Sequence, residues 1–167
     1  PAHAPSTNPV DITVNIGTES ATFYNAYTYV PSITSITPAS GPITAGNTVV
    51  IAGSGFLNGT TVKFGTQTAA IVIDSDSQIT ATVPTGLAVG AVDLVVTVGS
   101  QSATFKSAYT YLSTISALSI GTGSSAGGDT LVITGAGFTS GTTVTIGGVA
   151  ATGIRRCSGS DIGVGCG

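Results

Sequence analysis

The chain has 167 residues, only 7 % of them charged, and a net charge of −3. Four basic residues cannot neutralise a run of phosphates, so we expect no nucleic-acid partner and no site on an acidic membrane surface. No apolar run approaches the roughly 20 residues that a membrane-spanning helix needs, so we expect no membrane insertion.

The first predicted strand is "VDITVNI", residues 10–16, in which apolar and polar residues alternate. Alternation of period two is typical of a strand that is buried on one face. The apolar residues that share this face are Val10, Ile12, Val14 and Ile16. The segment "SATFYNAYTYV", residues 20–30, predicts an aromatic strand directly after it.

The next strand, "TVVIAG" at residues 48–53, is a nearly continuous run of β-branched and small apolar residues. This pattern predicts a strand that is buried on both sides. The segments "TTVKFG", "AAIVID" and "QITATVP" follow at short spacing, separated by turn-forming residues, and no segment has a helical period. About seven short strands in some 82 residues predict an immunoglobulin-like β-sandwich. Its predicted core contains Val50, Ile51, Phe56, Val62, Phe64, Ile79, Val83, Val92, Leu94, Val96, Phe105 and Tyr109.

The sequence repeats itself with an offset of 82 positions. The phrase at Ser20–Val30 recurs as "SATFKSAYTYL" at Ser102–Leu112, and Gly46–Gly65 matches Gly128–Gly147 in the same register. We therefore predict three parts: the closing strands of one module in residues 1–30, a complete module in 31–112, and the earlier strands of a further module in 113–167.

Three elements of this repeat resemble the IPT/TIG domain, an immunoglobulin-like fold that plexins, Rel-type transcription factors and bacterial surface proteins share. They are the lead-in "ITSITPASGP" from Ile33, the segment "VVIAGSGF" that ends at Phe56, and the closing "ATFKSAYTY". The second copy departs from the lead-in, because "SALSIGTGSSAGG" has neither proline. The resemblance implies an all-β fold of tandem sandwich modules in an extracellular or cell-surface protein.

Several residues of the repeat have a physical role that the pattern predicts. The glycines of "GSGF" suit a tight turn or a close backbone approach, and the phenylalanines that follow them, Phe56 and Phe138, are expected to cover the end of the sandwich. We expect four tyrosines in the core or at a module junction, with a stacking platform for sugars as the alternative. These are Tyr27, Tyr29, Tyr109 and Tyr111.

No convergent set of titratable side chains suggests catalysis, so we predict no enzyme activity, no catalytic residues, no metal and no cofactor. The sole histidine, His3, lies in a proline-rich segment. The pair Asp74 and Asp76 fits a turn, with a Ca²⁺ site as the alternative. Asn58 begins "NGT", which fits a turn or an N-glycosylation site, and the pair Arg155–Arg156 fits a solvated turn or a contact to a neighbouring subunit.

The two cysteines, Cys157 and Cys166, are predicted to form a disulfide bond, within or between chains. A shift of the repeat by one residue aligns Ile162, Val164 and Cys166 with Ile79, Ala81 and Val83. Cys157 then lies on the preceding strand or its turn, within reach across a hairpin.

The sequence favours a structural or adhesive surface protein over a carbohydrate- or protein-binding module of a larger secreted enzyme or surface protein. The repeat is cut out of phase, so each end of the chain supplies only part of a module. Its expected partners are copies of itself, joined head to tail by strand complementation into a filament, or neighbouring modules of the same polypeptide. The predicted interface residues are Val10, Ile12, Val14, Ile16, Phe23, Tyr27 and Tyr29.

Overall fold

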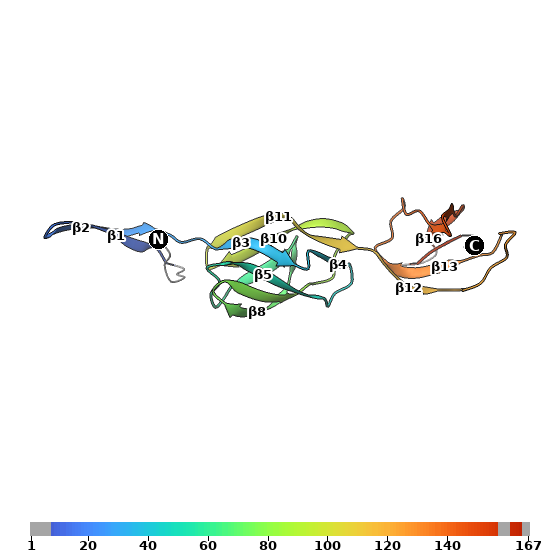
Figure 1. Cartoon of the computed structure of the whole chain (residues 1–167), viewed down its shortest axis with the longest axis horizontal. Coiled ribbons are helices and arrows are strands. Elements are labelled where there is room, and N and C mark those ends of the chain that lie inside the picture. Colours follow the sequence, from blue (N-terminus) through green and yellow to red (C-terminus); the bar gives the residue numbers. More distant parts are fainter. Residues whose placement is uncertain (1–7, 157–160, 165–167) are drawn as a thin grey trace. The chain divides into compact units, whose positions relative to one another are not determined.

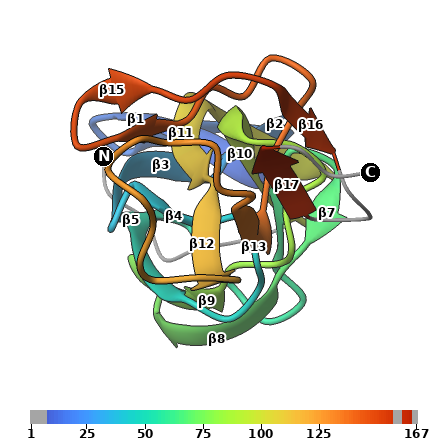
Figure 2. The same ribbon diagram turned by 90° about the vertical axis from the view of Figure 1, so that its right-hand side faces the viewer.

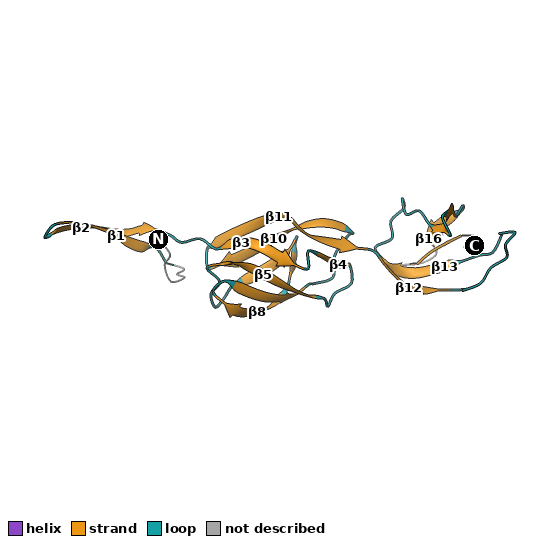
Figure 3. Ribbon diagram, viewed as in Figure 1, coloured by secondary structure: helices purple, strands orange, loops and turns teal. Residues whose placement is uncertain are grey.

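The structure, a computed structural model, describes residues 8–156 and 161–164, and all regular structure among them is β-strand (Figures 1 and 3). None of the described residues belongs to a helix that could cross a membrane. The strands are β1 (Val10–Ile16), β2 (Glu19–Tyr27), β3 (Ser32–Thr37), β4 (Ser40–Pro42), β5 (Thr48–Ser54), β6 (Thr61–Phe64), β7 (Gln67–Thr68), β8 (Ala70–Ser75), β9 (Gln78–Thr82), β10 (Gly90–Val98), β11 (Gln101–Leu112), β12 (Thr114–Leu118), β13 (Val132–Ala136), β14 (Thr145–Ile146), β15 (Val149–Ala150), β16 (Ile154–Arg156) and β17 (Asp161–Val164).

The chain divides into two compact units. The first holds β1 to β3 and most of the central strands, and the second holds β12 to β17 with short adjoining segments. Their residues are 1–41, 45–85 and 91–110 for the first unit, and 42–44, 86–90 and 111–167 for the second.

The central strands form two sheets, which confirms the predicted sandwich. One sheet has the order β3-β5-β9-β8 and the other has the order β4-β11-β10-β6-β7. Figure 2, turned by 90° from Figure 1, shows β5, β9 and β8 following one another in one curved layer. Within this layer the antiparallel register aligns Ile36, Ile51, Ile79 and Ile73 in a single row across all four strands. This row lies on the inner face, because Ile36, Ile51 and Ile79 are buried.

The core consists mainly of residues that the alternation pattern predicts. Nine of the predicted side chains are buried: Ile51, Phe56, Val62, Phe64, Ile79, Val83, Leu94, Val96 and Tyr109. The rings of Phe64 and Tyr109 meet edge to face, with centroids 5.3 Å apart. Val92 is only half-buried.

The prediction that residues 48–53 are buried on both sides is wrong. In β5 the side chains alternate, so that Val49 and Ile51 are buried whereas Val50 is 38 % exposed. Val50 lies opposite Thr37 and Thr80 on the outer face of its sheet. An antiparallel sheet can leave one face in water, and β-branched residues suit that face as well as the core.

Phe105 was also predicted as a core residue, but its side chain is 36 % exposed. It lies on β11, which has only the three-residue strand β4 on its other side. On this side the Thr110 N–H donates to the Ala39 oxygen and the Ile43 N–H donates to the Leu112 oxygen, both at the far end of β11. Phe105 therefore lies where β11 is the edge of the sheet, and water reaches part of its ring.

The two glycines of each "GxGF" segment have different structural roles. Gly55 has a φ of +79° and Gly137 a φ of +84°, as a tight turn requires. Gly53 instead permits a close approach, because a Cβ there would lie 2.5 Å from the Phe56 ring and against the carbonyl oxygen of Ser32. Phe56 is buried, as expected of a core residue, and Phe138 is half-buried.

The "NGT" segment forms a turn, as predicted. The Thr60 hydroxyl donates to the carbonyl oxygen of Leu57 at 2.6 Å and accepts from the Leu57 N–H at 3.1 Å. The second copy repeats the turn, with the Thr139 N–H donating to the Thr142 hydroxyl at 2.8 Å.

In the second unit β12, β13, β17 and β16 form a four-stranded sheet, while β14 and β15 form a separate hairpin. Ile133 lies opposite Ile162, just as Ile51 lies opposite Ile79 in the central sandwich. These pairs confirm the one-residue shift of the repeat between β13 and β17.

Arg155 and Arg156 lie in strand β16 and not in a turn, so the predicted solvated turn is wrong. Arg156 is opposite Ile162, the position that Ile73 occupies opposite Ile79. The other basic residues of the chain, Lys63 in β6 and Lys106 in β11, also lie in strands.

Candidate interaction surface

The β1–β2 hairpin exposes an apolar face. Its register places Ile12 opposite Phe23, Val14 opposite Ala21, and Val10 opposite Tyr27. Among the predicted interface residues, five are exposed: Ile12 (46 %), Val14 (56 %), Ile16 (77 %), Phe23 (73 %) and Tyr27 (52 %). Val10 and Tyr29 are half-buried. A face of this kind marks an interaction site or an aggregation hazard.

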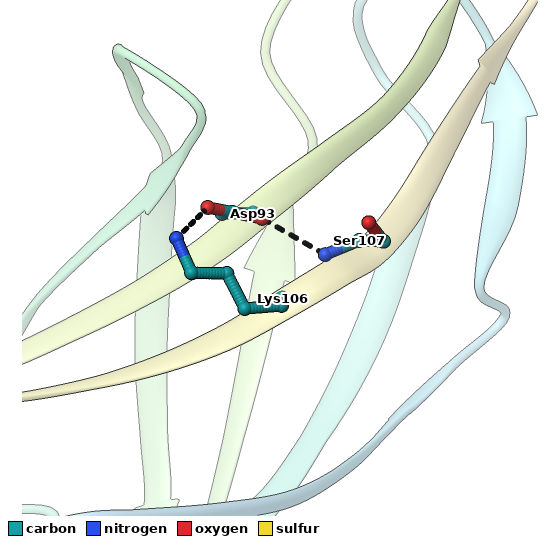
Figure 4. A network of polar contacts seen from close by, with 3 residues as sticks. All are labelled: Asp93, Lys106 and Ser107. Carbon is teal, nitrogen blue, oxygen red and sulfur yellow. Dashed lines mark hydrogen bonds and ion pairs between the residues drawn. The ribbon is translucent and has the colours of Figure 1, made fainter.

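The same hairpin geometry occurs in β10–β11. In the first hairpin the Asp11 carboxylate accepts the N–H of Asn25 at 2.7 Å, and Asn25 has a φ of 51°. In β10–β11 the Asp93 carboxylate accepts the N–H of Ser107 at 2.9 Å, and Ser107 has a φ of 48° (Figure 4). A non-glycine residue in the left-handed region is uncommon. Its occurrence at equivalent positions of both hairpins therefore shows that the repeat retains this local backbone conformation.

Asp93 has a second partner, Lys106, which distinguishes it from Asp11. The Lys106 Nζ lies 2.6 Å from Asp93 Oδ2 (Figure 4). The hydrogen bond from Lys106 and that from the Ser107 N–H lower the pKa of the Asp93 carboxyl. Since the Lys106 side chain is 79 % exposed, this ion pair contributes little to stability. Tyr24 occupies the position of Lys106 in the first hairpin and is 72 % exposed.

The two hairpins differ in what covers their apolar faces. In β10–β11 the residues equivalent to Ile12, Val14, Ile16 and Tyr27 are Leu94, Val96, Val98 and Tyr109, and all four are buried. They are buried because β10 pairs with β6 and the opposite sheet closes over them. Among the described residues β1 and β2 pair only with each other. The same face is therefore a core face in one copy and a surface in the other.

The second unit also exposes apolar side chains. Its β14 occupies the position of β6 but pairs only with β15 among the described residues. From β12 onward the exposed large apolar residues are Ile115 (66 %), Leu118 (53 %), Ile120 (40 %), Ile146 (57 %) and Val149 (72 %). The unit thus has a complete first sheet and only the start of a second.

The family model of the IPT/TIG domain matches residues 31–111 and again residues 113–165. The chain belongs to the IPT/TIG domain family. The family relationship inferred from the repeat and the fold class of tandem IPT/TIG sandwich modules are both confirmed.

Solved structures share parts of this IPT/TIG chain at low identity. The plexin A4 extracellular region, domains 1 to 10, is 19 % identical, with a TM-score of 0.47 over 70 % of this chain and 10 % of the plexin chain. SGBP-B from a complex xyloglucan utilization locus in Bacteroides uniformis is 20 % identical, with a TM-score of 0.44 over 80 % of this chain and 38 % of that chain. An auxiliary nutrient binding protein from Bacteroides thetaiotaomicron is 16 % identical, with a TM-score of 0.43 over 54 % and 22 %. The chain thus spans well under half of each of these proteins, and no curated protein sequence matches it.

The remaining predicted site residues of the IPT/TIG chain fall in three groups. Tyr109 and Tyr111 are buried in the core, whereas Tyr27 and Tyr29 pack edge to face with centroids 5.0 Å apart. His3, Cys157 and Cys166 lie outside the described residues, so the disulfide bond stays a prediction.

The third group is the aspartate pair of the central IPT/TIG module. Asp74 Oδ2 accepts the Thr80 hydroxyl at 2.7 Å and the Gln78 amide at 3.2 Å across the β8–β9 hairpin. The turn forms between Ser75 and Gln78, and there the backbone oxygen of Asp76 accepts the N–H of Phe56. Across the described ranges no cluster of three or more His, Cys, Asp or Glu side chains is placed to hold a metal ion.

Sequence reasoning missed one polar pair in the IPT/TIG core. The Asn47 amide donates to the Tyr109 hydroxyl at 2.7 Å. Burial raises the pKa of the Tyr109 hydroxyl, and the hydrogen bond from Asn47 opposes that rise. The signal was available in the repeat, where the position of Asn47 is occupied by Asp129.

Proposed function

We propose that this protein is a non-catalytic structural protein of the extracellular space or cell surface, whose copies join head to tail into a filament. In this assembly the β1–β2 hairpin of one copy completes the C-terminal half-module of the next by strand addition. The observation that carries the proposal is that the β1–β2 hairpin repeats the aspartate hydrogen bond and the left-handed residue of β10–β11 but leaves its apolar face exposed.

The strands of the two partial modules complement each other without duplication. By the repeat offset, β12, β13, β17 and β16 correspond to β3, β5, β9 and β8, and β14 and β15 correspond to β6 and β7. The hairpin β1–β2 corresponds to β10–β11. Together they supply every strand of a module except the equivalent of β4.

The central module predicts the register of the joint. There Leu94 lies opposite Phe64, Val95 opposite Lys63, and Val96 opposite Val62. The equivalent pairs across the joint are Ile12 with Ile146, Thr13 with Thr145, and Val14 with Val144. This register turns the exposed face of the hairpin toward the sheet formed by β12, β13, β17 and β16.

The missing equivalent of β4 is expected to form on docking. In the central module β4 exists because the Thr110 N–H donates to the Ala39 oxygen and the Ile43 N–H donates to the Leu112 oxygen. Residues 122–124 of the second unit are not a strand. When β2 docks, the equivalent bonds run from the Thr28 N–H to Gly121 and from the Ser125 N–H to Val30. Strand formation at residues 122–124 would thus accompany assembly.

A contact between two different surfaces of the chain joins its copies head to tail. Unless the rotation from one copy to the next closes a ring, such a contact produces an open filament. The two cysteines support an extracellular location, because a disulfide between Cys157 and Cys166 would need an oxidising compartment. A tandem array within a longer polypeptide would use the same contact between covalently joined modules.

Removal of residues 1–30 tests the proposal. The intact chain should form filaments visible by electron microscopy, and the truncated chain should stay monomeric while its far-UV circular dichroism remains that of a β protein. A peptide of residues 8–30, when it is added, should bind the truncated chain without extending it into a filament. A truncated chain that still forms fibres, or an intact chain that stays monomeric, contradicts the proposal.

A cross-link tests the register separately. Thr13→Cys together with Thr145→Cys should give a disulfide between copies under mild oxidation, identified by mass spectrometry of the joined peptides. Thr13→Cys with Thr143→Cys is the matched control, because these two positions are out of register. Equal cross-linking of both pairs would refute the predicted register.

A further inference from the structure

The surface that the second unit offers to the hairpin of another copy resembles the one that β10–β11 fills in the central module, since the two sites share most of their residues. One difference between the sites lies at the residue that meets the closing tyrosine. In the central module this residue is Asn47, and in the second unit it is Asp129.

The pocket around this residue is built alike in both places. A Cβ at Gly41 would lie 2.7 Å from the Asn47 amide nitrogen and against the Tyr109 hydroxyl. A Cβ at Gly123, the equivalent glycine, would lie 2.8 Å from Asp129 Oδ2. In the central module the Tyr109 hydroxyl and the Asn47 amide fill the space beside Gly41, and in the second unit the Asp129 carboxylate lies in the space beside Gly123.

The polar partners differ in a way that fits a carboxylate. Asp129 Oδ2 accepts the N–H of Ser124 at 2.5 Å. The equivalent residue in the central module is Pro42, which has no N–H to give. Because a carboxylate has two oxygens and only accepts, Asp129 can hold Ser124 with one oxygen and a hydroxyl with the other.

We infer that Asp129 is the residue that selects the hairpin of the next copy, by accepting a hydrogen bond from the Tyr27 hydroxyl. This inference rests on the proposed head-to-tail assembly. Tyr27 is the equivalent of Tyr109, so in the docked register its hydroxyl would lie beside Gly123 and Asp129, as that of Tyr109 lies beside Gly41 and Asn47. In the central module the amide donates to the tyrosine, whereas at the joint the tyrosine donates to a carboxylate. A hydrogen bond to a charged acceptor is roughly twice as strong as a neutral one, so Asp129 holds the hairpin better than an asparagine at this position would.

The test measures the critical concentration for filament formation of the full chain and five variants. Tyr27→Phe and Asp129→Ala should each raise it about tenfold, the loss of one charge-assisted hydrogen bond. The double variant should raise it no further than either single change, because both remove the same bond. Asp129→Asn should raise the critical concentration to an intermediate value, about threefold, because it keeps a hydrogen bond to Tyr27 but only a neutral one, as in the Asn47–Tyr109 pair. Tyr24→Phe is the matched control, because Tyr24 occupies the exposed position of Lys106 and should have no effect.

The outcomes separate this inference from the proposed function. If the wild type does not assemble, both fail. If the wild type assembles and Tyr27→Phe or Asp129→Ala matches it, this inference alone fails. A double variant whose effect equals the product of the single effects also overturns it, because independent effects mean that the two side chains do not meet. Thermal unfolding of each variant, followed by circular dichroism, shows whether the fold is intact.

Discussion

Two phenylalanines of the central sandwich lie on inner faces of the same sheet but differ in burial, and we predict that their removal has unequal cost. Phe64 is 1 % exposed and packs edge to face against Tyr109, whereas Phe105 is 36 % exposed. Phe64→Ala should lower the free energy of unfolding by about 3–5 kcal/mol, because it removes a buried ring and leaves a cavity. Phe105→Ala removes a ring that is about two-thirds buried, at an edge where water fills the space. Its cost should be about 1–2 kcal/mol, two-thirds of the full transfer value with no cavity added.

Native-state hydrogen exchange followed by mass spectrometry measures both costs in the full chain. Peptides that cover β5, β9 and β10 report the opening of the central sandwich and not of the second unit. The central strand β9 of the wild type supplies the reference protection. An equal loss for the two variants, or a larger loss for Phe105→Ala, would show that exposure does not govern the cost and that the edge assignment of β11 is wrong.

Three further predictions concern single sites. Gly53→Ala should destabilise the chain by about 1–3 kcal/mol in urea unfolding, since its Cβ would overlap the backbone, and an unchanged midpoint would refute the close approach. Burial raises the pKa of Tyr109 above 10.0, so the folded state keeps a proton that the unfolded chain releases near pH 10; stability should fall as pH rises above that value, and Tyr109→Phe should flatten this decline. Cys157 and Cys166 should form a disulfide that stabilises by roughly 2–3 kcal/mol, and thiols that titrate in the unreduced native protein would contradict it.

The fold was predictable because its signals are local. Alternation over residues 10–16, turn residues between short strands, and a repeat of fixed offset together define the sandwich before any contact is known. The one-residue shift was also predictable, because Ile162 must face the core to match Ile79. Its pairing with Ile133 in the structure follows from that requirement.

The errors arose where burial depends on neighbours in space. Val50 is part of an apolar run, and only the position of its strand in a one-sided sheet shows that it faces water. Phe105 points inward, but the shortness of β4 leaves it at an edge, and a strand length of three residues is not visible in composition. Asn47 and Tyr109 lie 62 positions apart in the sequence, so no local sequence pattern predicts their hydrogen bond. The interface residues of β1 and β2 were chosen from the pattern, and their exposure in the structure is what makes them available to a partner.

The placement of basic residues has a consequence for proteolysis. Proteases of the trypsin class cut after lysine or arginine, and they need the cut segment to leave its fold. Three of the four such residues of the chain, Lys63, Lys106 and Arg155, lie in strands and are followed by another strand residue, while Arg156 is the last residue of β16. Exposed loop tips are the usual sites of nicking. Digestion by trypsin after Lys63, Lys106 or Arg155 must therefore wait for a strand to unpair, so its rate at these three bonds reports how often the sheets open.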